Sequence, residues 1–121
     1  MHQTTVTCHL KVEGLHYWKG AREIAEVDYL AHPHRHTFTL KAEFKVNHDD
    51  RDIEFIKHAH LIRDYLSIQY WDRNYKLHNF GPRSCEMIAQ EIFDEFKAIS
   101  VYVDEDGEHG ATVCAPKNQT T

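Results

Sequence analysis

The 121-residue sequence lacks several features that mark whole classes of protein. It has no uninterrupted apolar run long enough to span a bilayer, and its start, MHQTTVTCHL, does not place a basic segment before an apolar one. We therefore expect neither a membrane partner nor secretion. Basic residues are also few, 14 against 19 acidic ones with a formal net charge of −5, which argues against a nucleic-acid partner.

Cysteine is sparse and shows no pairing pattern. The three cysteines are an odd count without a CxxC pair, which predicts a cytoplasmic protein that is not held by disulfides. The composition, 41% hydrophobic and 27% charged, is that of an ordinary globular protein, and no repeat or linker divides the chain. We expect one domain over residues 1–121, with 116–121 as a frayed polar tail.

Alternating apolar and polar residues predict four strands. They are residues 4–16, 34–46, 99–103 and 111–114. The second has the cleanest alternation, with Phe38, Leu40 and Phe44 on the face that points inward.

Apolar residues at helical spacing predict two helices, one over about 55–67 with Phe55 and Ile56 in its apolar stripe, and a second that Ser84 can cap. Residues 52–55 are expected to be extended and residues 68–83 irregular. The resulting order, β-β-α-α-β-β with adjacent strands joined as hairpins, predicts an α+β fold. We expect a four-stranded antiparallel sheet covered by two helices on one face.

Histidine is abundant, with eleven residues, and three of them have the parity of core residues. His34 and His36 share the inward parity of Phe38 and lie about 7 Å apart along the strand. His16 is in phase with the inward residues of the first strand. Three imidazoles aimed into one interior can form a facial set of ligands with an open fourth position, the pattern of catalytic zinc. Histidines that are simply hydrogen-bonded in a core fit the same pattern.

Glu105 is the other residue out of place, because it continues the inward parity of Val101 and Val103. A buried carboxylate needs hydrogen-bond donors, and a ligand with adjacent N–H groups would supply two of them. The alternative is that the strand ends at Val103 and Glu105 only opens the acidic turn that follows.

Five segments follow one another at compatible spacing: LKVEGLHYW with His16, HRHTF with His34 and His36, IEF, RSCEMIAQEIF with Ser84, and VYVDEDGEHGATV with Glu105. Taken in order, they resemble the 6-pyruvoyltetrahydropterin synthase and 6-carboxytetrahydropterin synthase family of the T-fold superfamily. The resemblance covers nearly the whole chain. It implies a sheet closed into a barrel by a homo-oligomer, a trimer or paired trimers, with active sites between subunits.

The resemblance also implies an activity. Family members are zinc-dependent carbon–oxygen lyases that act on a pterin such as dihydroneopterin triphosphate. Carried over residue by residue, zinc would be held by His16, His34 and His36, and Glu105 would anchor the amino-pyrimidine edge of the pterin. Ser84, which matches part of the family's PT-x-E motif, is a second substrate-binding candidate.

The chain departs from the family in its proton-transfer groups. Where the family carries a catalytic cysteine four to six residues before the first histidine of HxH, this chain has Asp28 and Leu30. The family's Leu-Asp-His motif is matched by 71–73, Trp-Asp-Arg, and an arginine stays protonated at neutral pH. A shifted alignment would instead bring His78, otherwise expected at the surface, into the relay. Asp28 and Asp72 are therefore the catalytic candidates.

Alternatives remain open for both the base and the function. Glu26 is the second choice for the base, and Cys85 is a weaker candidate nucleophile at a helix start. The function is a lyase with an unusual base, a pterin- or purine-binding protein that keeps zinc and the glutamate anchor without turnover, or a different reaction on a related purine or pterin.

Overall fold

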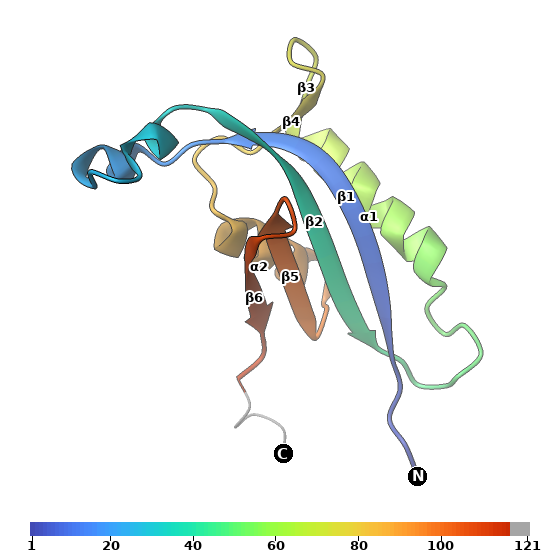
Figure 1. Cartoon of the computed structure of the whole chain (residues 1–121). Coiled ribbons are helices and arrows are strands. Elements are labelled where there is room, and N and C mark those ends of the chain that lie inside the picture. Colours follow the sequence, from blue (N-terminus) through green and yellow to red (C-terminus); the bar gives the residue numbers. More distant parts are fainter. Residues whose placement is uncertain (117–121) are drawn as a thin grey trace.

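The computed structural model describes residues 1–116 and has an α+β fold (Figure 1). Its elements, with η marking 3-10 helices, are β1 (Thr5–His16), η1 (Lys19–Glu23), η2 (Asp28–Ala31), β2 (His34–Lys45), α1 (Phe55–Tyr70), β3 (Trp71–Asp72), β4 (Leu77–Asn79), α2 (Cys85–Phe96), β5 (Ser100–Glu105) and β6 (His109–Cys114). Neither α-helix is long and apolar enough to cross a membrane. Apart from its first residue, the predicted tail 116–121 lies outside the described residues.

The sheet has six strands in the order β3-β4-β1-β2-β5-β6 and is mixed, because β4 runs parallel to β1. The predicted four-stranded antiparallel sheet is therefore wrong in its strand count and in one pairing. The residues expected to be irregular, 68–83, contain the missed β3–β4 hairpin. These strands are only 2 and 3 residues long, too short for alternation to reveal them. The sheet is open, with β3 and β6 at its edges, so no closed barrel forms within the described chain.

Element boundaries differ from the sequence expectations at two places, and the second matters for the site. Residues 52–55 form no strand: α1 already begins at Phe55, and Glu54 is its N-cap, whose side chain accepts hydrogen bonds from the backbone N–H groups of Ile56 and Lys57. The strand expected to end near Val103 continues to Glu105, which pairs with Phe38 of β2. Glu105 thus belongs to the sheet and not to a solvated turn.

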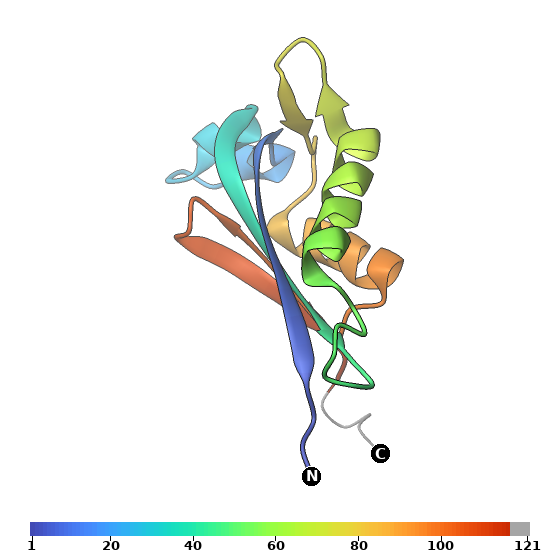
Figure 2. The same ribbon diagram turned by 90° about the vertical axis from the view of Figure 1, so that its right-hand side faces the viewer.

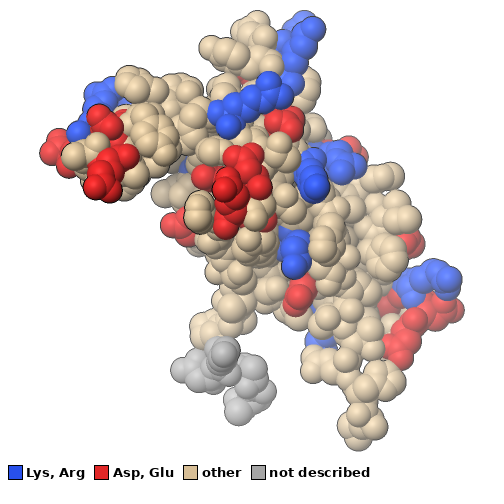
Figure 3. All heavy atoms as spheres, in the orientation of Figure 1, with Lys and Arg blue, Asp and Glu red and all other residues tan. Residues whose placement is uncertain are grey.

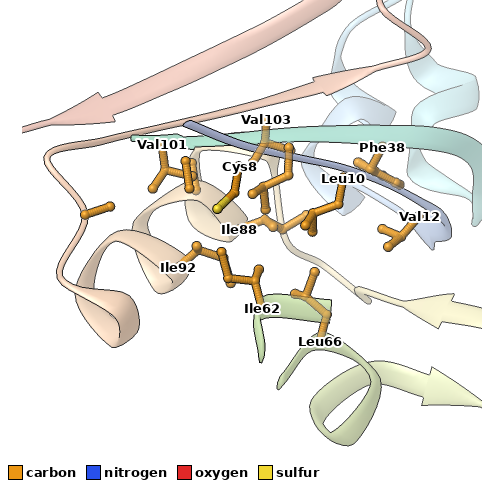
Figure 4. Packing of buried hydrophobic residues seen from close by; sticks show 14 of the residues in the cluster. Cys8, Leu10, Val12, Phe38, Ile62, Leu66, Ile88, Ile92, Val101 and Val103 are labelled. Carbon is orange, nitrogen blue, oxygen red and sulfur yellow. The ribbon is translucent and has the colours of Figure 1, made fainter. Parts of the chain in front are cut away.

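Both α-helices cover the same face of the sheet, as predicted (Figure 2). The core lies between the two layers, where α1 contributes Ile62 and Leu66 and α2 contributes Ile88 and Ile92 (Figure 4). Burying one such side chain stabilises the fold by roughly 1.5–3 kcal/mol. Two residues expected in the apolar stripe of α1 point away from this core. These are Phe55 and Ile56, which are 52% and 59% exposed.

The loop that leads into α2 is tied to the far end of β1. The backbone N–H of Phe80 donates to the Leu15 carbonyl at 2.8 Å, and that of Tyr17 donates to the Gly81 carbonyl at 2.9 Å. Gly81 has a φ of 60°, a left-handed conformation that glycine adopts without steric cost. These bonds bring the start of α2 beside His16, the last residue of β1.

Candidate metal centre

The structure brings His16, His34 and His36 together at the end of the long β1–β2 pair. His16 lies directly opposite His34 across the two strands, and His36 is the next inward residue along β2. The three ring centroids are 4.5 to 5.4 Å apart, and one nitrogen from each ring lies within 4.8 Å of the others. The antiparallel register therefore converts an alternating pattern in sequence into a cluster of three imidazoles.

Each of the three rings has an acceptor at its Nδ1 atom. The Nδ1 atom lies 2.9 Å from the Arg83 carbonyl in His16, 2.8 Å from the His32 carbonyl in His34 and 2.7 Å from Asp106 Oδ2 in His36. Because a carbonyl or carboxylate can only accept, Nδ1 of each ring is the donor in its hydrogen bond, and Nε2 lies on the other side of the ring. This is how proteins orient metal-binding histidines.

Burial and packing hold the histidines in these positions. His16 is only 8% exposed, and Phe38 packs edge-on against it and against His36, with centroids 5.1 and 5.8 Å apart. Phe80 packs against Phe38 in turn, at 5.0 Å. Gly14 makes this packing possible, because a Cβ there would lie 2.7 Å from the Phe80 ring and 2.9 Å from the Phe38 ring.

The electrostatics of His16 favour the neutral, metal-binding form. Burial lowers the pKa of His16 below its ordinary value, and the neighbouring His34 and His36 act in the same direction. The Arg83 carbonyl and Glu105 oppose the shift without reversing it. Its Nε2 atom and that of His36 are both buried and make no hydrogen bond. Buried nitrogen lone pairs that converge without a donor are what a divalent cation would satisfy.

The carboxylate of Glu105 lies beside this cluster and contacts two of its rings. One carboxylate oxygen lies 2.9 Å from His16 Nε2 and the other lies 3.4 Å from His36 Nε2. The Cys85 thiol donates to the first oxygen at 3.8 Å. Acidic side chains also gather around the β5–β6 turn, and Figure 3 shows them on this face of the molecule. Negative charge therefore accumulates beside the histidines and favours a bound cation.

A pocket of about 510 Å³ opens beside the cluster, within the size range of small-molecule sites. It is lined by two of the histidines, His16 and His34, and by Glu105. The start of α2 forms another wall and includes Ser84, whose hydroxyl accepts a hydrogen bond from the backbone N–H of Met87 as the helix cap. Two of the clustered histidines, Glu105 and Ser84 thus line one pocket.

No family model matches the chain, and no curated protein matches it. The case for a metal centre therefore rests on the geometry of the site. Its strongest element is the orientation of the three imidazoles, because the acceptors at their Nδ1 atoms come from three separate segments of the chain.

The catalytic candidates from sequence lie apart from this pocket. Asp28 is exposed on η2 and, like Glu26, does not line it. Asp72 is held in the β3–β4 turn, where it accepts hydrogen bonds from the N–H groups of Asn74 and Tyr75. The bond from Tyr75 lowers the pKa of Asp72 below its ordinary value. Asp72 therefore has a structural role in its own chain.

Two further residues differ from the sequence expectations. His78 is not at the surface: it is 6% exposed in β4 and stacks on Phe80, away from the pocket. Cys85 does line the pocket, but burial and the nearby Glu105 raise the pKa of its thiol to about 12. At neutral pH Cys85 is a protonated thiol and not the thiolate that a nucleophile requires.

Sequence reasoning missed two groups that orient the histidines. Asp106 was seen only as part of an acidic run, yet its carboxylate contacts His36 and accepts a hydrogen bond from the backbone N–H of Thr37 at 2.8 Å. Its position directly after Glu105 was the one available signal. The Arg83 carbonyl gave no signal, because every residue has a carbonyl and only the loop before α2 aims this one at His16.

Proposed function

We propose that this protein is a zinc-dependent lyase that acts on a pterin such as dihydroneopterin triphosphate. The observation that carries the proposal is the set of three histidine Nε2 lone pairs converging beside a pocket that also contains Glu105. The sequence resemblance to the 6-pyruvoyltetrahydropterin and 6-carboxytetrahydropterin synthases supplies the substrate class.

The residues present fit a zinc ion. His16, His34 and His36 would hold it through Nε2, because Nδ1 of each ring already faces an acceptor. When bound, zinc supplies a Lewis acid that polarises a substrate oxygen and makes a neighbouring proton easier to remove. The contribution of the chain is to fix the imidazoles and to exclude water from their buried side.

The pocket has features that suit a planar, nitrogen-rich substrate. Trp18 and Met87 add apolar surface to its lining, while Glu105 offers a carboxylate whose two oxygens can accept parallel N–H groups from an amino-pyrimidine edge. Ser84 adds a hydroxyl at the same wall. This mixture of apolar walls and few polar groups is typical of small-molecule sites.

A second function is favoured by one observation, the position of the candidate bases. Neither Asp28 nor Asp72 lines the pocket of its own chain, and Cys85 is protonated. A pterin- or purine-binding protein that keeps the zinc site and the glutamate anchor, without turnover, needs none of these groups. A lyase would need its base from a movement of η2 or from a neighbouring copy of the chain.

Such a neighbouring copy is part of the proposal. The open sheet leaves β3 and β6 as edge strands, which a homo-oligomer, a trimer or paired trimers, would pair and protect. Active sites between subunits would then receive residues such as Asp72 from the adjacent chain. Sedimentation at micromolar concentration tests this point, and a sedimentation coefficient that fits only a 14.3 kDa monomer would contradict it.

The metal half of the proposal is tested by metal analysis of the purified protein. We expect close to one zinc per chain, and loss of that zinc when His34 and His36 are both changed to Ala. His9→Ala is the matched control, because His9 lies on the exposed face of the strand that carries His16. Full zinc in the double variant would overturn the assignment.

Product analysis with dihydroneopterin triphosphate tests the reaction. Zinc-dependent release of triphosphate supports the lyase. Binding of pterins by the zinc-loaded protein without turnover supports the second function. If the protein neither binds pterins nor turns them over, the pterin assignment is refuted and the metal centre is unaffected.

A further inference from the structure

Trp18 presents a large aromatic surface at the pocket without being buried by its own chain. It follows the metal-site residue His16 by one residue between them, and it lines the pocket while remaining 50% exposed. Half of its apolar surface therefore gains nothing from the core. Aromatic side chains that line a pocket are typical contact surfaces for small molecules.

The backbone at Trp18 is fixed from two sides. Its N–H donates to the Leu30 carbonyl in η2 at 2.8 Å, and the N–H of Tyr17 donates to the Gly81 carbonyl in the loop before α2 at 2.9 Å. These two acceptors lie far apart in the sequence. The residue is therefore held in place by the fold, although its side chain is not in the core.

The indole ring is fixed as well, by the glycine at the start of η1. A Cβ at Gly20 would lie only 2.7 Å from Trp18 Nε1, so the ring rests directly against the Gly20 backbone. A larger residue at position 20 would have to displace the ring. An aromatic surface that is already held in one position loses little conformational entropy when a ligand binds to it.

The other groups of the pocket complement this surface. Glu105 offers carboxylate oxygens, which accept N–H groups at the edge of a heterocycle. The indole of Trp18 offers a π face, which suits the face of the same kind of ring. Met87 on α2 adds a further apolar side chain to the lining. The pocket thus provides separate partners for the edge and the face of one planar ligand.

We propose that Trp18 is a specificity-determining residue of the pocket, and that its indole stacks on the planar ring of the pterin while Glu105 binds the edge of that ring. The inference rests on the proposed function and deepens it, because it names the group that selects a planar aromatic ring. A ligand without a π face would lose this contact even if it offered the same N–H groups to Glu105.

Binding of neopterin to the zinc-loaded full chain tests this role. Equilibrium dialysis measures the dissociation constant for the wild type, for Trp18→Ala, which removes the ring, and for Trp18→Phe, which keeps a smaller aromatic face. Trp71→Ala is the matched control, because Trp71 is also 50% exposed but does not line the pocket. Zinc content and sedimentation are measured for every variant.

We expect Trp18→Ala to bind neopterin at least about ten-fold more weakly than the wild type, the scale on which a base stacked on an aromatic side chain contributes to binding. Trp18→Phe should lose less affinity, and Trp71→Ala should bind as the wild type does. Zinc content and sedimentation should be unchanged in all three variants.

Fluorescence gives an independent readout of the contact, because the chain has only two tryptophans. In Trp71→Phe the emission comes from Trp18 alone, and neopterin should quench it strongly. In Trp18→Phe the emission comes from Trp71 alone, and quenching should be much weaker.

Neopterin affinity equal to the wild type in Trp18→Ala would overturn the stacking role alone. A loss of zinc in that variant would assign Trp18 to the support of the metal centre, and a changed sedimentation coefficient would assign it to a contact between copies of the chain. Either result would also overturn the stacking role. A zinc-loaded wild type that binds no neopterin would instead overturn the proposed function, so the two failures are distinguishable.

Discussion

Phe38 packs in the core and also contacts the histidines of the candidate metal centre, so replacing it by Ala tests both roles. Its ring is 2% exposed and lies against His16, His36 and Phe80. Phe44 lies on the same face of the same strand and is also 2% exposed, but its ring contacts His58 instead. Phe38→Ala and Phe44→Ala therefore remove equal amounts of buried ring at different distances from the metal centre.

The size of the effect follows from burial. Truncating a fully buried Phe to Ala typically lowers the free energy of unfolding by about 3–5 kcal/mol, because the loss of apolar burial and the cost of the remaining cavity add together. Both variants are expected to lose this much. Only Phe38→Ala also frees two imidazoles to rotate, so it alone should weaken zinc binding by about ten-fold, equivalent to about 1.4 kcal/mol.

Urea unfolding of the metal-free variants measures the first quantity, and chelator competition on the folded proteins measures the second. If Phe38→Ala does not fold, Phe38→Leu keeps most of the apolar volume and tests the same contact. Equal zinc affinity in the Phe38 and Phe44 variants would refute the view that Phe38 holds the ligands in place.

Three further outcomes are expected. Asp106→Asn should lower zinc affinity about 10–100-fold, because the neutral amide orients His36 less firmly than the carboxylate does. The same competition assay measures this affinity, and a value equal to the wild type would contradict the orienting role of Asp106. At pH 8 iodoacetamide should modify the exposed Cys114 much faster than the buried Cys85, because the pKa of the Cys85 thiol is raised to about 12. Similar rates for the two cysteines by mass spectrometry would show that burial does not protect Cys85. Desolvation and the hydrogen bond to Glu91 raise the pKa of Tyr65 to about 12, so this residue stabilises the fold fully below pH about 10 and less as the pH rises towards 12. Ultraviolet titration should show two late-ionising tyrosines, because the pKa of Tyr70, which donates to the same carboxylate, is also raised, and Tyr65→Phe should remove one of them.

Much of the candidate site could be predicted because it depends on alternation along strands. His34 and His36 follow the period-two pattern of β2, and the hairpin-like pairing of β1 with β2 sets His16 opposite them. Glu105 was recognised by the same rule, since its parity was that of Val101 and Val103. The sequence left open whether the strand reached it, because the acidic run that follows is equally typical of a turn.

The sequence by itself therefore determined the features that follow from periodic patterns: the two helices, the long strands and the inward direction of the three histidines. The tertiary structure decided everything that depends on contacts between distant segments. These are the β3–β4 hairpin beside β1, the Arg83 carbonyl and Asp106 carboxylate that orient His16 and His36, and the approach of Glu105 to their nitrogens. Such contacts leave no periodic trace, because each arises from the position of one backbone or side-chain group in three dimensions. The sequence predicts which side chains point inward, and only the fold determines which atoms they meet there.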